Sequence, residues 1–436
     1  MDVAQRLVQH FEEDSPFVPS PPTTIAETGL TESFLTELVL KLLYVRGVLS
    51  GYEAARETGL PLSGIIEESL DGLRREHLIE VRGAGPGLST SGYQYVISER
   101  GRQRAREVMA INGYVGVAPV PLPAYRSAVQ RQSLAAGSVS ERDVRQGLAH
   151  LVLREEVLRQ LGPAVNSGRS IFLWGPTGNG KTAVAEAIGR ILPGTIYIPL
   201  ALFVGGAVIR LFDLHAHWPM ESRSTPRSGA LKIDGRWARI RRPLIVAGGE
   251  LTMQSLDLVY DPTTRTHEAP FQLKANNGLF LIDDFGRQQV RPRDLLNRWI
   301  LPLERRVDYL TLTTGKQIEV PFDPLILFST NLDPDDLVDE AFLRRIRYKI
   351  YLPDPTFNEF REIFKRLCHA RGIPYDDRAL AYLVREYYLK PNRRIRACHA
   401  RDVVDELVDI ARFQLQRPLL TKELIDEACQ SYFVRA

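Results

Sequence analysis

The segment that most constrains this chain is a glycine-rich loop between an apolar run and a helical pattern. Ile171–Trp174 is a four-residue apolar run typical of a buried strand, and GPTGNGKT follows it at 175–182. A helical pattern, AVAEAIGRIL, comes next. A strand, a loop of the form GxxxxGK[ST] and a helix, in this order, make a phosphate-binding loop. The chain is therefore predicted to bind a nucleotide.

Each residue type in this loop has a physical reason to be there. Glycines let successive backbone N–H groups face phosphate oxygens, and the N-terminus of the following helix adds a favourable dipole. Lys181 supplies positive charge, and the Thr182 hydroxyl can bind Mg²⁺. The alternative is a glycine-rich turn without a ligand. The predicted nucleotide-binding residues are Gly175, Pro176, Thr177, Gly178, Asn179, Gly180, Lys181 and Thr182.

Two further apolar runs end in polar residues. The run at 279–282 is followed by Asp283 and Asp284, and the run at 324–328 leads to Asn331. We expect Asp283 to hold Mg²⁺ through water and Asp284 to orient or deprotonate the attacking water. Asn331 would touch the γ-phosphate or its water. The alternatives are a solvated acidic turn for the aspartates and a turn cap for Asn331.

Two adjacent arginines, Arg344 and Arg345, follow the residues DEAFL. Their guanidinium groups suit phosphate oxygens and could reach the nucleotide of a neighbouring subunit. The alternative is a basic surface in contact with water.

Together these segments resemble the AAA+ ATPases over residues 140–436. In that resemblance GPTGNGKT corresponds to Walker A, LFLIDD to Walker B, STN to sensor 1 and DEAFLRRI to the arginine-finger segment. HARDV corresponds to sensor 2, which selects Arg401 over Arg393, Arg394 and Arg396. Most members have Glu where this chain has Asp284.

The resemblance implies an α/β core with a parallel sheet and a C-terminal helical lid. It also implies ATP and Mg²⁺ as cofactors, hydrolysis of ATP, and a homo-oligomeric, hexameric ring. The arginine directly before the apolar residue is the usual finger, which favours Arg345 over Arg344 as the catalytic arginine.

The distance from Lys181 to Asp283 is longer than a minimal core needs, and predicts an insertion around 205–250, after the second strand. QLKANNGLFLIDD and LLNRWILPLE resemble MoxR-like ATPases, magnesium-chelatase ATPase subunits and bacterial enhancer-binding activators. A hairpin from 310–312 to 317–320 is expected before sensor 1. This branch implies chaperone-like remodelling of a protein client.

The first third of the chain has a different pattern. Helices are expected over 35–43, from Ser50 to Gly59 with Glu53 completing a capping box, and over 63–76. Strands are expected at 78–82 and 93–97, joined by a glycine-rich turn. Three helices followed by a hairpin resemble a winged helix-turn-helix.

A winged helix usually binds DNA. Here residues 1–122 carry 16 Asp and Glu against 11 Lys and Arg, a net charge of −5 that phosphate binding does not favour. We therefore expect this unit to dock protein, although the basic run from Arg100 to Arg106 leaves DNA contact open.

Composition sets the broad class. The chain has 436 residues, 44% of them hydrophobic and 25% charged, and three cysteines. No signal-peptide pattern and no apolar run of 18 residues are visible, so a cytoplasmic protein without a membrane span is expected. The predicted parts are an arm at 1–30, the winged helix at 31–110, a proline-containing linker at 111–135, the ATPase core at 136–353 and the lid at 354–436.

Three weaker signals remain. His215 and His217 could be a metal pair, but no third ligand is visible, so they are taken as structural. Cys368, Cys398 and Cys429 are expected to lie buried in the lid rather than to bind zinc. The basic stretch 236–242 could contact a client, another subunit or nucleic acid, or only water.

Three functions stay open. The first is an ATP-driven ring that remodels a protein client. The second is a DNA-acting ATPase, a loader or regulator, that uses the winged helix. The third is a nucleotide-gated scaffold with very slow hydrolysis, because Asp284 replaces the usual Glu.

Overall fold

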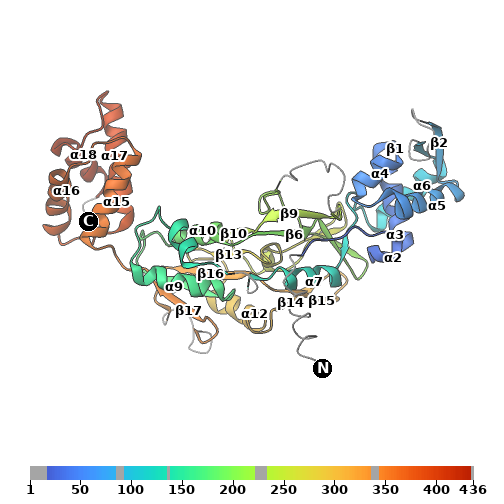
Figure 1. Ribbon diagram of the computed structural model, residues 1–436, viewed down its shortest axis with the longest axis horizontal. Helices are drawn as coiled ribbons and strands as arrows, with labels where there is room; N and C mark the ends of the chain where they lie inside the picture. Colours follow the sequence, from blue (N-terminus) through green and yellow to red (C-terminus); the bar gives the residue numbers. More distant parts are fainter. Residues whose placement is uncertain (1–16, 85–92, 135–137, 221–232, 335–342, 434–436) are drawn as a thin grey trace.

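The computed structural model describes residues 17–84, 93–134, 138–220, 233–334 and 343–433. The chain is elongated, with an N-terminal unit at one end, a helical lid at the other and two sheets between them (Figure 1). Residues 1–16 of the expected arm, the glycine-rich turn at 85–92 and the segment DEAF lie outside the described residues.

The central sheet has five parallel strands. They are β5 (Ile171–Trp174), β10 (Leu244–Ala247), β13 (Leu279–Ile282), β16 (Leu325–Thr330) and β17 (Tyr348–Tyr351). Their order is β10-β13-β16-β5-β17, with every neighbouring pair parallel. This arrangement confirms the expected α/β core with a parallel sheet.

Helices cover both faces of this sheet, which explains why β5, β13 and β16 are apolar throughout. On one face lie α8 (Glu141–Gly147), α9 (Glu155–Asn166) and α10 (Lys181–Ile191). On the other face α12 (Pro292–Arg305) packs Trp299 against Phe280 and Phe328. Because the strands are parallel, the loop after β5, Asp283 and Asn331 all follow carboxyl ends at one edge of the sheet.

A second sheet, in the order β11-β12-β8-β7-β4, stands beside the first. Its strands are β4 (Val120–Pro121), β7 (Ala201–Val204), β8 (Ala207–Arg210), β11 (Val259–Asp261) and β12 (Thr266–Glu268). Two antiparallel pairs accompany it: β6 (Thr195–Pro199) with β9 (Trp237–Arg241), and β14 (Val307–Thr311) with β15 (Gln317–Pro321). The second pair confirms the predicted hairpin.

The inserted strands have other bounds than the expected 205–250. The inserted strands β6 to β9 come after α10 and before β10, which is the second strand of the parallel sheet, and β11 and β12 follow β10. The apolar run at 195–199 looks like a core strand in sequence, but it pairs antiparallel with β9. The prediction of an insertion at 205–250 therefore included the core strand β10.

The segment at 111–135 also differs from the expected linker. Residues Leu122–Arg131 form helix α7, which carries Pro123 in its first turn. A proline is tolerated there because the first N–H groups of a helix have no intrahelical acceptor. Tyr125 is buried against the second sheet, and its hydroxyl donates to the carbonyl of Leu273. This segment is part of the packed core.

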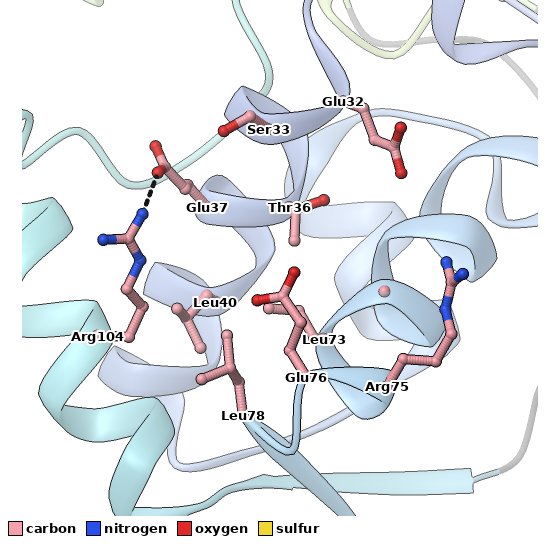
Figure 2. A pocket seen from close by; sticks show the side chains of 11 residues that line it. Glu32, Ser33, Thr36, Glu37, Leu40, Leu73, Arg75, Glu76, Leu78 and Arg104 are labelled. Atoms are coloured by element: carbon pink, nitrogen blue, oxygen red, sulfur yellow. Dashed lines mark hydrogen bonds and ion pairs between the residues drawn. The ribbon is translucent and has the colours of Figure 1, made fainter.

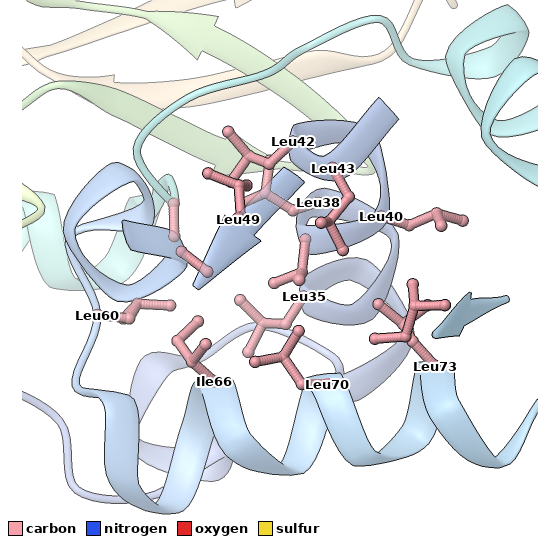
Figure 3. Close-up of a cluster of buried hydrophobic side chains, with 14 of the residues drawn as sticks. Leu35, Leu38, Leu40, Leu42, Leu43, Leu49, Leu60, Ile66, Leu70 and Leu73 are labelled. Carbon is pink, nitrogen blue, oxygen red and sulfur yellow. The ribbon is translucent and has the colours of Figure 1, made fainter. Parts of the chain in front are cut away.

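The N-terminal unit contains α3 (Glu32–Arg46), α4 (Gly51–Thr58), α5 (Glu67–Arg75) and α6 (Glu99–Ile111). A three-stranded sheet joins them, β1 (Val48–Ser50), β3 (Tyr93–Ile97) and β2 (Ile79–Ala84), in the order β1-β3-β2. Leucines of α3, β1 and α5, together with Leu60 and Ile66 between α4 and α5, fill its core (Figure 3). The capping box of Ser50 and Glu53 is confirmed, whereas α5 begins later than expected because Ser63 and Gly64 are not helical.

This unit is built onto the second sheet. Phe34 of α3 packs on Phe203 of β7 with ring centroids 4.7 Å apart. A Cβ added at Gly59 would lie 2.6 Å from the carbonyl oxygen of Gly235, so the two backbones touch there. In the expected arm, Phe17 packs edge-on against Trp237. The N-terminal unit therefore has a fixed packing surface on the insertion.

The lid consists of helices α15 (Phe357–Ala370), α16 (Asp377–Val384), α17 (Ala397–Phe413) and α18 (Lys422–Tyr432). A short π-helix, η5 (Arg385–Leu389), extends α16, so the C-terminal segment is helical, as expected. Among the described residues, no helix combines the length and the apolar composition needed to cross a bilayer.

Candidate nucleotide-binding site

The glycine-rich loop joins β5 to α10 and is held in shape by close contacts. Gly175 has φ +142°, and a Cβ there would lie 2.2 Å from the carbonyl oxygen of Leu352. Gly180 caps α10 in the left-handed conformation with φ +82°. Residues with a side chain rarely adopt these backbone angles, so the conformation of the loop requires glycine at positions 175 and 180.

Lys181 lies in the first turn of α10 and is 7% exposed. Its Nζ donates to the carbonyl oxygens of Gly175 and Pro176, each at 3.0 Å. Burial lowers the pKa of Lys181, and the nearby carboxylates of Asp284 and Asp283 oppose that shift. The ammonium is thus positioned inside the loop, where a phosphate would replace the two carbonyls as its partner.

Thr182 and Asp283 meet at the mouth of the loop. The Thr182 Oγ1 donates to Asp283 Oδ2 at 2.7 Å, across 101 residues of sequence. A hydroxyl and a carboxylate side by side are the hard oxygen ligands that Mg²⁺ prefers, and the ion needs only one or two protein ligands beside phosphates and waters. In the described parts of the chain, no group of three or more His, Cys, Asp or Glu forms a separate metal site. The residues present fit Mg²⁺ held jointly with a nucleotide.

Asp284 follows Asp283 in the left-handed conformation, with φ +49°. Its N–H donates to Asp283 Oδ1 at 3.0 Å, and the next residue, Phe285, donates its N–H to the carbonyl of Ser329 at 2.7 Å. The hydroxyl of Thr330 in turn donates to the carbonyl of Phe285. These bonds tie the acidic loop to the end of β16, so its two carboxylates are held beside the phosphate loop.

A cavity of about 760 Å³ opens between the phosphate loop and the lid. On the core side it is lined by loop residues 177–182, by Asp283 and by Asp284. Apolar residues from two distant segments complete it: Leu151, Val152 and Leu153 before α9, and Ile363, Leu367 and Ala370 on α15. Sequence reasoning missed these six, because nothing local marks apolar residues that meet only in the folded chain.

Arg401 lines the same cavity from the first turns of α17. Its guanidinium pairs with Asp402 at 2.9 Å, and Tyr432 donates to the other carboxylate oxygen of Asp402 at 2.7 Å. Arg396, the residue before α17, is close enough to lower the pKa of Lys181. Arg401 thus lines the cavity on the lid side, and Arg396 is a second positive charge near the loop.

Asn331 follows β16 at the same edge of the sheet but does not line the cavity. Arg345 is farther away. It precedes β17, and its carbonyl accepts from Ser170, the residue just before β5. The phosphate loop begins at the opposite end of β5. Four strand residues at about 3.3 Å each separate the two ends, so Arg345 cannot reach the nucleotide of its own chain.

The weaker sequence signals have structural explanations. His217 is buried, its Nδ1 accepts from the Asp213 N–H at 2.9 Å, and its Nε2 is 2.9 Å from the carbonyl of Lys274. Cys368 and Cys429 are buried in the lid as expected, but Cys398 is only half-buried and lies against the phosphate loop.

The basic stretch 236–242 is partly interior. Arg236 forms a buried ion pair with Asp234 at 2.9 Å and donates to the carbonyl of Thr28. Arg242 donates to the carbonyls of Gln132 and Asn277. These two arginines hold segments of the chain together and are unavailable to nucleic acid.

One family model matches part of this chain. A family described as a domain of unknown function, DUF8689, matches residues 356–431, which lie in the lid. No curated protein matches the chain.

Two solved structures show the degree of likeness. NtrX from Brucella abortus in complex with ADP is 16% identical with a TM-score of 0.38, covering 78% of this chain and 60% of that chain. RuvB from Thermotoga maritima, a Holliday junction branch migration motor, is 12% identical with a TM-score of 0.37, covering 65% of this chain and 70% of that chain. This chain spans about 60% of the length of NtrX. At this level of similarity, the activities of NtrX and RuvB are not assigned to this chain.

Proposed function

We propose that this chain binds ATP together with Mg²⁺ and hydrolyses it. One observation carries the proposal: the phosphate loop, the two carboxylates after β13 and Arg401 all line a single cavity of about 760 Å³. The apolar part of the cavity, from Leu151 to Leu153 and on α15, suits a purine base.

The roles of the residues follow from their positions. Backbone N–H groups of 175–182 and the Lys181 ammonium bind the phosphates. Thr182 and Asp283 would hold Mg²⁺, which when bound neutralises charge on the β- and γ-phosphate oxygens. The Asp284 carboxylate orients the attacking water and accepts its proton. Asn331 follows β16 at the same edge of the sheet but does not line the cavity, so its contact with that water is proposed from the resemblance alone.

The complete site needs a second copy of the chain. Since Arg345 lies at the edge of the sheet opposite the phosphate loop, any contact it makes with a γ-phosphate is with a neighbour's nucleotide. This geometry supports a homo-oligomeric ring, and the resemblance suggests six subunits. Arg344, the adjacent residue, lies with Arg345 in a turn and not on a helix; it is exposed and would hold the interface.

The N-terminal unit, as a proposed winged helix, fits a protein partner better than DNA. A groove of about 460 Å³ between α3, α5 and α6 is lined by the acidic residues Glu32, Glu37 and Glu76 (Figure 2). Its basic residues are Arg75 and Arg104. Arg104 pairs with Glu37 at 3.1 Å, and Arg102 on the same helix pairs with Glu99 at 3.4 Å. The basic run after the wing is thus partly neutralised within the unit, which favours the remodelling of a protein client in a MoxR-like manner.

Phosphate release tests the enzymatic proposal. With Mg²⁺ and ATP, the specific activity of the full chain should rise with protein concentration, because the arginine acts between subunits. Turnover below about one per hour at all concentrations would favour the nucleotide-gated scaffold. Salt-sensitive binding of the full chain to duplex DNA would favour the DNA-acting ATPase.

A further inference from the structure

Asn179 lies inside the phosphate loop, yet its side chain bonds two segments outside it. The side chain is buried, and the residue is 7% exposed. Its Nδ2 donates to Asp354 Oδ1 at 2.8 Å, and its Oδ1 accepts from the Ala397 N–H at 3.3 Å. The two partners require the same orientation of the amide, because one is an acceptor and the other a donor.

Both partners belong to the connection between core and lid. Asp354 lies between β17 and α15, where the chain enters the lid. Ala397 is the first residue of α17, the helix that brings Cys398 and Arg401 to the cavity. The first N–H groups of a helix have no acceptor within the helix, so the phosphate loop supplies one to α17.

A backbone contact reinforces the connection between the phosphate loop and the lid, which we call the joint. The Cys398 N–H donates to the carbonyl of Gly178 at 2.8 Å. A Cβ added at Gly178 would lie 2.3 Å from Cys398 Sγ, so only glycine allows the helix to come so close. The start of α17 therefore rests directly on the phosphate loop.

We propose that Asn179 is a positioning residue that holds the lid over the nucleotide cavity by capping α17 and tethering Asp354. A change in the phosphate loop is then transmitted directly to the lid. This inference rests on the proposed nucleotide site, but the contact itself exists in the chain without nucleotide.

Hydrogen exchange of the full-length protein tests the joint. In Asn179→Ala, the amides of 397 and 398 should lose protection, while those of α17 from 403 to 413 should keep it. Thr177→Ala is the matched control, because Thr177 is an exposed side chain of the same loop, and it should leave both regions unchanged. Asp354→Ala should reproduce the Asn179→Ala result.

A double substitution should restore the protection of these amides. Asn179→Asp combined with Asp354→Asn keeps an acceptor for the Ala397 N–H and reverses the bond between the two side chains. Protection at 397 and 398 should return in this double variant. Unchanged protection in both Asn179→Ala and Asp354→Ala would overturn the proposal, as would deprotection of the double variant equal to that of Asn179→Ala.

Ligand binding distinguishes a loss of lid positioning from a distorted phosphate loop in Asn179→Ala. Asn179→Ala should raise the Kd for ADP about fivefold, because a net loss of about 1 kcal/mol in lid contacts corresponds to that factor. The Kd for pyrophosphate, which the loop alone can bind, should change less than twofold. An equal loss for both ligands would assign Asn179 to the loop only. If the wild-type chain bound neither ligand, the proposed function would fail, whereas the exchange result would still decide the joint.

Discussion

Arg345 forms an ion pair with Glu304, Nε to Oε1 at 2.6 Å, at the edge of the central sheet opposite the phosphate loop. The side chains are 29% and 48% exposed, and ion pairs of this kind contribute about 0–1 kcal/mol. Arg345 can therefore leave Glu304 for a neighbour's nucleotide at little cost in free energy.

Arg345→Ala should bind ATP normally but hydrolyse it on the order of 10³-fold more slowly, because an arginine acting in trans stabilises the transition-state charge. Glu304→Gln is the matched control. It breaks the weak ion pair but leaves the arginine in place, so its turnover should stay within about fivefold of wild type. Steady-state phosphate release measures both variants.

Mixing subunits tests whether the arginine acts between chains. Arg345→Ala subunits should regain part of their turnover when Asp284→Asn subunits are added, since a mixed ring contains interfaces with an intact base facing an intact arginine. If Arg344→Ala shows the defect instead, Arg344 is the finger. If neither variant slows hydrolysis, the proposed role of this segment is wrong.

Substitutions of Asp283 and Asp284, the two carboxylates after β13, should affect different steps. Asp283→Ala removes the partner of the Thr182 hydroxyl and should abolish the Mg²⁺ dependence of ATP binding. Asp284→Asn keeps the size of the side chain, so ATP should stay bound while hydrolysis falls on the order of 10²-fold or more. Binding with and without Mg²⁺, together with single-turnover hydrolysis, distinguishes them. Wild-type turnover in Asp284→Asn would place the activation of water elsewhere.

Lys41 predicts a pH dependence of stability in the N-terminal unit. The residue is 2% exposed, its Nζ donates to the carbonyl of Asn112 at 3.0 Å, and burial lowers its pKa to about 8. Between pH 8 and about 10.4 the unfolded chain keeps the proton that the folded chain has lost, so Lys41 adds stability as pH rises through this window.

Lys41→Met should remove this contribution. The free energy of unfolding of wild type, relative to the variant, should rise by about 2–3 kcal/mol from pH 7.5 to 10. Urea unfolding at several pH values measures the difference, and Lys365→Met, at an exposed lysine, is the control. A constant difference between wild type and Lys41→Met would show that Lys41 keeps its ordinary pKa.

Features that depend on neighbouring residues in sequence were predictable. The loop at 175–182, the strand before Asp283 and the helices of the lid all follow from local periodicity and turn chemistry, and the structure contains them. The capping box of Ser50 and Glu53 belongs to the same class.

Features that depend on contacts between residues far apart in sequence could not be predicted. The apolar run at 195–199 has the composition of a core strand, and only its pairing with β9 shows that it belongs to the insertion. The prolines at 119–123 suggested an extended linker, but burial of Tyr125 stabilises a helix there. The apolar wall of the cavity and the bonds of Asn179 join segments up to 218 residues apart, which no local pattern reveals.

The central claim is that the cavity between the phosphate loop and the lid binds ATP. Calorimetric titration of ATP with Mg²⁺ into wild type, Lys181→Ala and Lys316→Ala tests it most directly. Loss of the Lys181 ammonium removes a charge-assisted bond to phosphate and should weaken binding at least tenfold. Lys316, an exposed lysine between β14 and β15, does not line the cavity, so Lys316→Ala should bind like wild type. Equal affinity of wild type and Lys181→Ala for ATP would contradict the account.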